Sequence, residues 1–180
     1  VLATAKNFIK NLTSNDQVAI TSFGTNSKQE STLSLNKDIA LSAIDSLFLS
    51  TTTLENTNIA GGLQDSFMEL KSSRVRSDSK KVIVFLTDGV PTEPQKVGEA
   101  NYPTIFAQSV ADDIKAGGIT IYTIGLGGKV NEDFLKGVSS DSLHYFSATT
   151  KDTLDSIYNK ISSSLCPKKP NVITVIYREI

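Results

Sequence analysis

Short apolar runs alternate with amphipathic segments along most of the chain. The run from Val82 to Leu86 has no polar break, and two lysines precede it. A continuous apolar run of this length is typical of a strand buried on both faces, as at the centre of a parallel sheet. Comparable runs predict strands over residues 17–23, 119–126 and 144–147, and a weaker alternation predicts an edge strand over residues 28–35.

Apolar residues at helical spacing predict helices between these strands. The predicted helices cover residues 1–12, 36–48, 59–73, 103–116, 131–138 and 151–165. This alternation favours an α/β fold: a doubly wound, mostly parallel sheet with helices on both faces and one antiparallel edge strand. Gly61 and Gly62 stand in the first turn of a predicted helix, where glycine lowers helix stability. We therefore expect either a close approach of the backbone to another element or a special loop geometry there.

Composition narrows the classes of partner. The 180 residues are enough for one domain with a sizeable core. The net charge of −1 favours neither nucleic acid nor an anionic membrane as partner. No apolar run approaches the length needed to span a membrane. Because Val1 is not a natural start, we expect the chain to be a piece of a longer protein.

The chain has one cysteine, Cys166, and one histidine, His144. These numbers exclude a Cys/His zinc cluster built from this chain alone and argue against a Cys-His or Ser-His hydrolase. Cys166 has two interpretations: a free thiol at a helix end, or half of a disulfide to a segment outside residues 1–180, in an oxidising compartment. Asn11-Leu12-Thr13 matches a glycosylation sequon, a triplet that is also common by chance.

Two polar residues stand where a ligand site would form. Asp88 follows the strand 81–87 directly, and ligands of open α/β sheets bind at the carboxyl ends of strands. Thr57 stands in a polar loop just before the helix from Ile59. Each has a simpler interpretation, because Asp88-Gly89 is a common turn pair and Thr57 could cap the helix. The glycine-rich segment 125–129 lacks the phosphate-loop pattern, so a plain turn is favoured there.

Four segments resemble, in order and spacing, the von Willebrand factor type A domain. They are Val18 to Phe23, Thr57-Asn58-Ile59, Thr87-Asp88-Gly89 and Ile121 to Gly127, and the resemblance covers roughly residues 1–166. It implies a Rossmann-like sheet with a metal-ion-dependent adhesion site, whose ligands are an Asp-x-Ser-x-Ser motif, a threonine and an aspartate. By position, Thr57 and Asp88 would be the metal-ligating threonine and aspartate. Hydroxyl and carboxylate oxygens suit Mg²⁺.

One part of the family pattern is missing from this chain. No Asp-x-Ser-x-Ser occurs before Thr57. The strand that carries this motif is central in the family's sheet, and a gap there would leave backbone groups unpaired. We therefore expect that strand to precede residue 1, or another segment to fill its place. Residues 172–177 are apolar enough to do so, but the simpler interpretation makes 167–180 a linker and the start of another module.

The resemblance implies a non-enzymatic adhesion module that uses Mg²⁺ to bind an acidic group on a protein or extracellular-matrix partner. With Thr57 and Asp88 alone, we expect this chain to bind Mg²⁺ weakly or not at all. It also implies a secreted or cell-surface protein, in which Cys166 could pair with a cysteine outside this chain. Two alternatives stay open: a metal-free scaffold for protein assembly, and a receiver-like or phosphoryl-transfer domain with Asp88 as acceptor.

Overall fold

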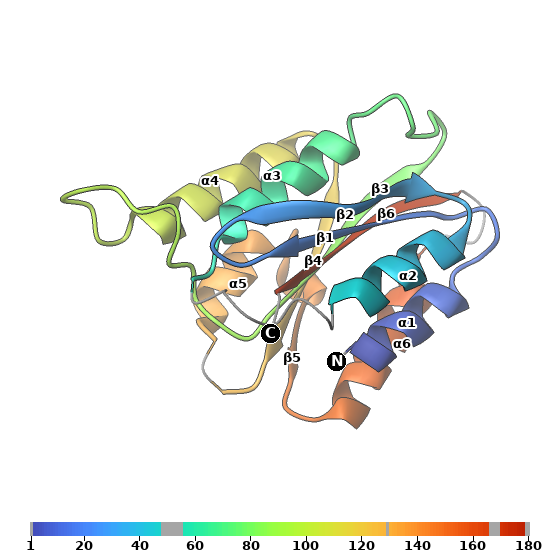
Figure 1. The fold of residues 1–180 in the computed structure, drawn as a ribbon. Helices are drawn as coiled ribbons and strands as arrows, with labels where there is room; N and C mark the ends of the chain where they lie inside the picture. The colour runs from blue at the N-terminus through green and yellow to red at the C-terminus, as the bar shows by residue number, and fades with distance from the viewer. Residues whose placement is uncertain (1, 48–55, 129, 166–169, 179–180) are drawn as a thin grey trace.

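The computed structural model describes residues 2–47, 56–128, 130–165 and 170–178. In these residues the strands form one six-stranded sheet in the order β2-β1-β6-β3-β4-β5 (Figure 1). Only the β1–β2 pair is antiparallel, and it places β2 at one edge of the sheet. The strands are β1 (Gln17–Phe23), β2 (Ser27–Ser34), β3 (Lys80–Thr87), β4 (Thr120–Leu126), β5 (Tyr145–Ala148) and β6 (Asn171–Arg178).

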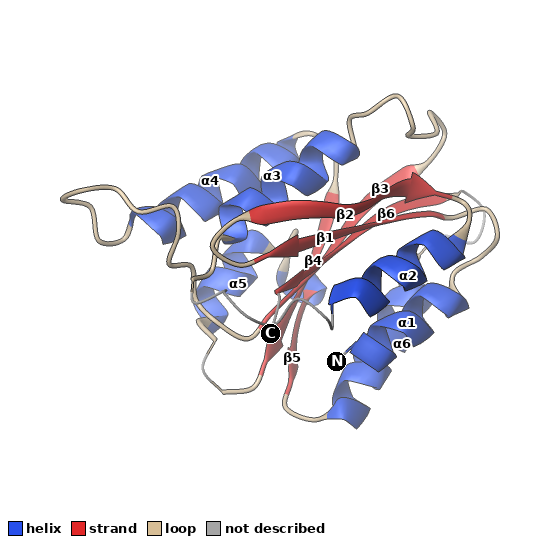
Figure 2. Ribbon diagram, in the orientation of Figure 1, coloured by secondary structure: helices blue, strands red, loops and turns tan. Residues whose placement is uncertain are grey.

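Helices cover both faces of the sheet (Figure 2). One face carries α1 (Leu2–Asn11), α2 (Lys37–Leu47) and α6 (Lys151–Ser164), and the other carries α3 (Ile59–Glu69), α4 (Tyr102–Ala116) and α5 (Glu132–Val138). A short 3₁₀ turn over Ser142–His144 precedes β5. The predicted α/β fold with a doubly wound, mostly parallel sheet is therefore confirmed. Among the described helices, none is long and apolar enough to cross a membrane.

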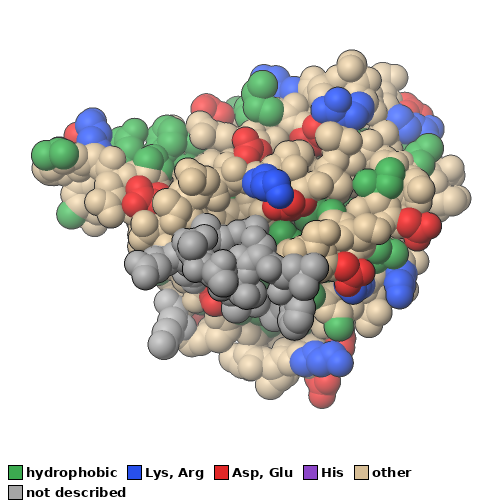
Figure 3. All heavy atoms as spheres, viewed as in Figure 1, with side chains coloured by type: hydrophobic (Ala, Val, Ile, Leu, Met, Phe, Trp, Pro, Cys, Tyr) green, Lys and Arg blue, Asp and Glu red, His purple; other side chains and the backbone are tan. Residues whose placement is uncertain are grey.

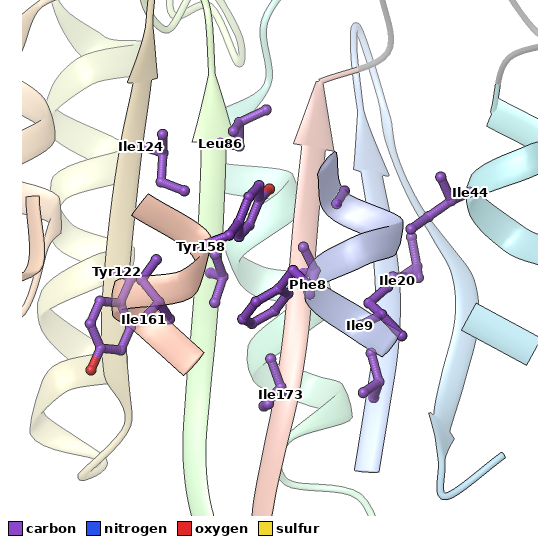
Figure 4. Packing of buried hydrophobic residues seen from close by; sticks show 14 of the residues in the cluster. Phe8, Ile9, Ile20, Ile44, Leu86, Tyr122, Ile124, Tyr158, Ile161 and Ile173 are labelled. Atoms are coloured by element: carbon purple, nitrogen blue, oxygen red, sulfur yellow. The ribbon is translucent and has the colours of Figure 1, made fainter. Parts of the chain in front are cut away.

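Each face of the sheet has its own apolar core, because successive side chains of a buried strand point to opposite faces. On one face Phe8 of α1 meets Tyr158 of α6, with ring centroids 5.0 Å apart. Figure 4 shows these rings between the helices and the strands. Sheet residues that face this core include Ile20, Ile124 and Ile173. A second apolar core lies on the other face of the sheet, under α3, α4 and α5.

The paired glycines of α3 lie where the helix packs closely on the sheet. A Cβ at Gly62 would stand 3.2 Å from Ile176 Cγ2 and 3.3 Å from a ring carbon of Phe23. A Cβ at Gly61 would stand 2.8 Å from Ser27 Oγ. The predicted close approach is therefore confirmed. It brings the start of α3, and the loop before it, against the end of β1.

Strand β6 occupies the centre of the sheet, between β1 and β3. The structure therefore differs from the interpretation in which this segment begins another module, and agrees with the one in which it fills the central place of the sheet. The physical reason is that Val172, Ile173, Val175 and Ile176 become fully buried there, while the strand completes the ladders of β1 and β3. Asp16 anchors the start of β6 by accepting the Asn171 backbone N–H at 2.8 Å.

Candidate functional site

The carboxyl ends of five strands meet at one edge of the sheet. Strands β1, β6, β3, β4 and β5 run parallel to their neighbours, so the segments that follow them emerge on the same side. Asp88 follows β3 directly, and residues 24–26 follow β1. We call this side the carboxyl-end edge. It is where ligands bind in open α/β sheets.

Thr57 lies at the junction of two loops at this edge. Its carbonyl oxygen accepts hydrogen bonds from the backbone N–H groups of Thr92 at 3.0 Å and Glu93 at 3.3 Å. Its own N–H donates to Thr92 Oγ1 at 2.7 Å. These bonds run through the Thr57 backbone, and the residue is only 2% exposed. The loop before α3 is thus fastened to the loop that begins with Asp88.

Asn58 ties the same junction to the end of β1. Its backbone N–H donates to the Gly24 carbonyl at 2.7 Å, and its side-chain amide donates to the Thr25 carbonyl at 3.3 Å. The Asn58 side-chain oxygen accepts from Gly61 N–H at 2.8 Å and so caps α3. The interpretation of Thr57 as the cap of this helix is therefore wrong. Three loops, after β1, before α3 and after β3, form one hydrogen-bonded unit.

Asp88 stands on a turn at the exposed surface of this unit. The Thr87 hydroxyl accepts from Gly89 N–H at 3.2 Å and lies 3.3 Å from the Gly89 carbonyl oxygen, to which it donates. The fully buried side chain of Thr87 thereby stabilises the turn through the backbone of Gly89. A turn and a ligand position are compatible here, because the turn leaves the Asp88 side chain exposed to solvent.

The donors present fall short of a complete metal site. Mg²⁺ takes six ligands in near-octahedral geometry and usually keeps several waters. Thr57 and Asp88 offer two oxygens of the right kind on joined loops. Among the described residues, no group of three or more His, Cys, Asp or Glu side chains could hold a metal ion. The central strand β6 (Asn171–Arg178) contains no Asp-x-Ser-x-Ser sequence.

The sequence pattern did not identify Thr92 and Glu93, whose backbone N–H groups donate to the Thr57 carbonyl from the loop after β3. Their signal was Pro91 and Pro94, which mark a shaped loop but not its contacts. It also missed the apolar side chains of this region: Val90 is 42% exposed, Val97 is fully exposed, and Ile105 of α4 is 63% exposed. Cys166, and with it the predicted disulfide, lies outside the described residues.

Comparison with known proteins gives a family and several similar folds. The model of the von Willebrand factor type A domain matches residues 1–160. Proximal thread matrix protein 1 from the mussel byssus is similar, with 19% identity and a TM-score of 0.74, over 92% of this chain and 40% of that one. A mussel structure with a zinc-occupied metal-ion-dependent adhesion site is 22% identical, with a TM-score of 0.68, over 89% of this chain and 38% of that one.

Two microbial structures are similar as well. The type V pili tip protein Mfa5 of Porphyromonas gingivalis is 15% identical, with a TM-score of 0.72, over 92% of this chain and 88% of the domain. Manganese-loaded TRAP protein of Plasmodium vivax is 19% identical, with a TM-score of 0.67, over 90% of this chain and 62% of that one. At these identities the likeness shows the fold. No curated protein matches this chain.

Proposed function

Because the chain belongs to the von Willebrand factor type A domain family, we propose that it is a non-enzymatic protein-binding module of the adhesion type. Its partner is a protein or extracellular-matrix ligand that presents an acidic group, and it binds at the carboxyl-end edge. The hydrogen-bonded unit of three loops carries this proposal, because it joins the two loops on which Thr57 and Asp88 lie. The similar byssus matrix and pilus tip proteins support an extracellular or cell-surface location.

Thr57 and Asp88 are, in this proposal, two oxygen ligands of a divalent cation, Mg²⁺ by the chemistry of the donors. A cation held there would supply positive charge to an incoming carboxylate. The zinc- and manganese-loaded relatives support this class of ion. Since the described residues do not complete the coordination shell, we expect the isolated chain to bind Mg²⁺ weakly or not at all. The metal-free scaffold is the nearest alternative.

Exposed apolar side chains on the loop that begins at Asp88, and on the helix α4 that follows it, would enlarge the contact with a protein partner. Val90 and Val97 lie on the loop between β3 and α4, and Ile105 lies one turn into α4. Figure 3 shows apolar side chains gathered on this projecting part of the molecule. Exposed apolar clusters with a polar rim are typical of protein-binding surfaces. A phosphoryl-transfer function is less well supported, because the described residues hold no cluster of carboxylates for its metal.

The experiment compares the binding of two immobilised peptides that differ only in Glu or Gln at one position. The wild-type chain is expected to bind the Glu peptide more tightly in Mg²⁺ than in EDTA, and Asp88→Asn to lose about tenfold or more in affinity, or about 1.4 kcal/mol. Asp113→Asn is the matched control, since Asp113 is also exposed but lies near the far end of α4.

Equal binding of the Glu and Gln peptides, with no loss in Asp88→Asn, would overturn the proposal. A loss in Asp88→Asn without any effect of EDTA would support the binding edge and replace the metal site by the metal-free alternative. Calorimetric titration with Mg²⁺ alone measures the weak intrinsic affinity directly.

A further inference from the structure

Asn11-Leu12-Thr13 is the one Asn-x-Ser/Thr triplet in the chain, and the structure places it favourably for modification. Asn11 is the last residue of α1, and it is exposed to solvent. Leu12 and Thr13 turn the chain from α1 towards β1. Because an attached sugar stays on the surface only where its asparagine is exposed, this position can hold a glycan without unfolding a helix or strand.

The surface next to Asn11 can receive the first sugars. A hollow between α1 and α6 is lined by the buried residues Thr4, Phe8 and Tyr158 and by five polar residues, Asn7, Lys10, Asn11, Asp155 and Asn159. Of the polar residues, Asn7, Lys10, Asn11 and Asn159 are exposed. Amide, ammonium and carboxylate groups can bond sugar hydroxyls, so the hollow suits a carbohydrate better than an apolar partner.

We infer that Asn11 is an N-linked glycosylation site. In this reaction Asn11 Nδ2 attacks C1 of the reducing-end sugar of a polyprenyl-pyrophosphate oligosaccharide. An Nδ2–C1 bond forms, the C1–O bond to the pyrophosphate breaks, and the amide nitrogen loses one proton to the transferase's base. The pyrophosphate leaves with the bonding electron pair, so no oxidant or reductant is needed.

The glycan would extend away from the binding edge proposed above. Asn11 precedes the amino end of β1, whereas Gly24 at the carboxyl end of β1 belongs to the three-loop unit (Figure 1). A strand of seven residues spans roughly 20 Å, which separates the two sites. A sugar at Asn11 therefore shields the opposite edge of the sheet and leaves Thr57 and Asp88 open.

The Thr13 hydroxyl has a second role in the folded chain, and the test must allow for it. It donates to Asp16 Oδ2 at 2.9 Å, and Asp16 is a buried carboxylate that also holds the start of β6. Thr13→Ala removes this bond together with the sequon. Thr13→Ser keeps both, and Asn11→Gln removes only the acceptor amide.

The test translates the chain behind a secretory signal in a cell-free system with endoplasmic-reticulum microsomes. Only the protease-protected, translocated fraction is scored. The wild-type chain and Thr13→Ser are expected to gain one glycan, seen as a gel shift that peptide-N-glycosidase removes with conversion of Asn11 to aspartate. Asn11→Gln and Thr13→Ala are expected to lose the shift. Asn15→Gln, an exposed asparagine outside any sequon, should keep it.

A translocated wild-type chain without a glycosidase-sensitive shift, or with an unmodified Asn11 peptide by mass spectrometry, would overturn the inference. A shift that survives in Asn11→Gln would do the same, because the sugar would then lie elsewhere.

Discussion

Two fully buried threonines on strands of the same sheet differ in whether their hydroxyls are satisfied. Thr21 Oγ1 accepts from Ser66 Oγ at 3.1 Å and donates to Gln29 Oε1 at 3.3 Å. Thr174 Oγ1 of β6 has no hydrogen-bond partner in the part of the chain that the structure describes. A buried hydroxyl left without a partner destabilises the folded state by about 1–3 kcal/mol. The two residues therefore make a matched pair.

Replacing each threonine by valine should change stability in opposite directions. We expect Thr174→Val to raise the free energy of unfolding by about 1 kcal/mol, because valine removes the unsatisfied group at nearly constant volume. Thr21→Val should lower it by about 1 kcal/mol, because it breaks two hydrogen bonds and leaves Ser66 and Gln29 short of a partner. Urea unfolding of the two variants measures both values. A loss of stability in Thr174→Val equal to that in Thr21→Val would contradict the assignment.

A buried carboxylate fastens the end of α3 to the edge strand β2. Glu69 Oε1 accepts from Leu33 N–H at 2.7 Å and from Arg74 Nε at 2.9 Å, while Oε2 accepts from Arg74 Nη2 at 2.6 Å. Burial is the largest influence on the Glu69 pKa and by itself raises it. The hydrogen bonds from Arg74 and Leu33, with the charge of Arg74, outweigh burial and lower the pKa. The ionised form of Glu69 therefore stabilises the fold.

This clamp should make stability depend on acid pH. A depressed pKa in the folded state gives stability that is complete above the pKa of an unfolded glutamate, about 4.3, and that is lost as pH falls through the folded value. We expect Glu69→Gln to lower the free energy of unfolding by about 2 kcal/mol at neutral pH. The difference from the wild type should shrink as the pH falls below about 4.

Denaturant unfolding at a series of pH values measures this difference. Glu99→Gln is the control, because Glu99 is exposed in a surface pair with Lys96 and should change little at any pH. A constant difference between wild type and Glu69→Gln from neutral to acid pH would show that the carboxylate charge is not what holds α3 to β2.

The helices and strands that depend on the local spacing of apolar residues could be predicted from the sequence. The features that depend on contacts between distant segments could not. The buried run Val82–Leu86 became β3 as expected. The predicted helix 59–73 ends at Glu69 in the structure. After Glu69 the chain forms tighter turns, in one of which Ser72 N–H donates to the Glu69 carbonyl. The buried Leu70 nevertheless continues the apolar spacing of the helix. Spacing alone cannot reveal that change.

The candidate site shows the same division. Thr57 and Asp88 follow from their places beside predicted elements, and the structure puts them on joined loops. Whether they ligate a metal stays a prediction. Thr92 could not be identified, because its contact with Thr57 depends on the path of a loop that no periodic pattern describes.

The position of β6 is the feature of the whole molecule that sequence pattern could not fix. Its apolar residues identify a buried strand, but any buried gap in the sheet could receive it. In the structure it joins two halves, β2-β1 on one side and β3-β4-β5 on the other. The carbonyl of Pro170 accepts from Lys80 N–H at 3.0 Å, and Asn171 binds Asp16. Both halves therefore hold the start of β6.

Removal of β6 should unfold the molecule as a unit. Val172, Ile173, Val175 and Ile176 are fully buried, and burial of each contributes about 2 kcal/mol. Their combined loss is comparable to the entire stability of an ordinary domain, about 5–15 kcal/mol, before the open ladders of β1 and β3 are considered.

We expect a chain of residues 1–166 to lose its cooperative thermal transition, measured by far-UV circular dichroism. A peptide of residues 167–180 added in trans should restore part of the transition. The same peptide with Ile173→Asp and Val175→Asp should not, because both side chains face the apolar core under α1, α2 and α6, where a buried charge is costly. Cooperative unfolding of 1–166 at the midpoint of the full chain would mean that the sheet does not depend on β6.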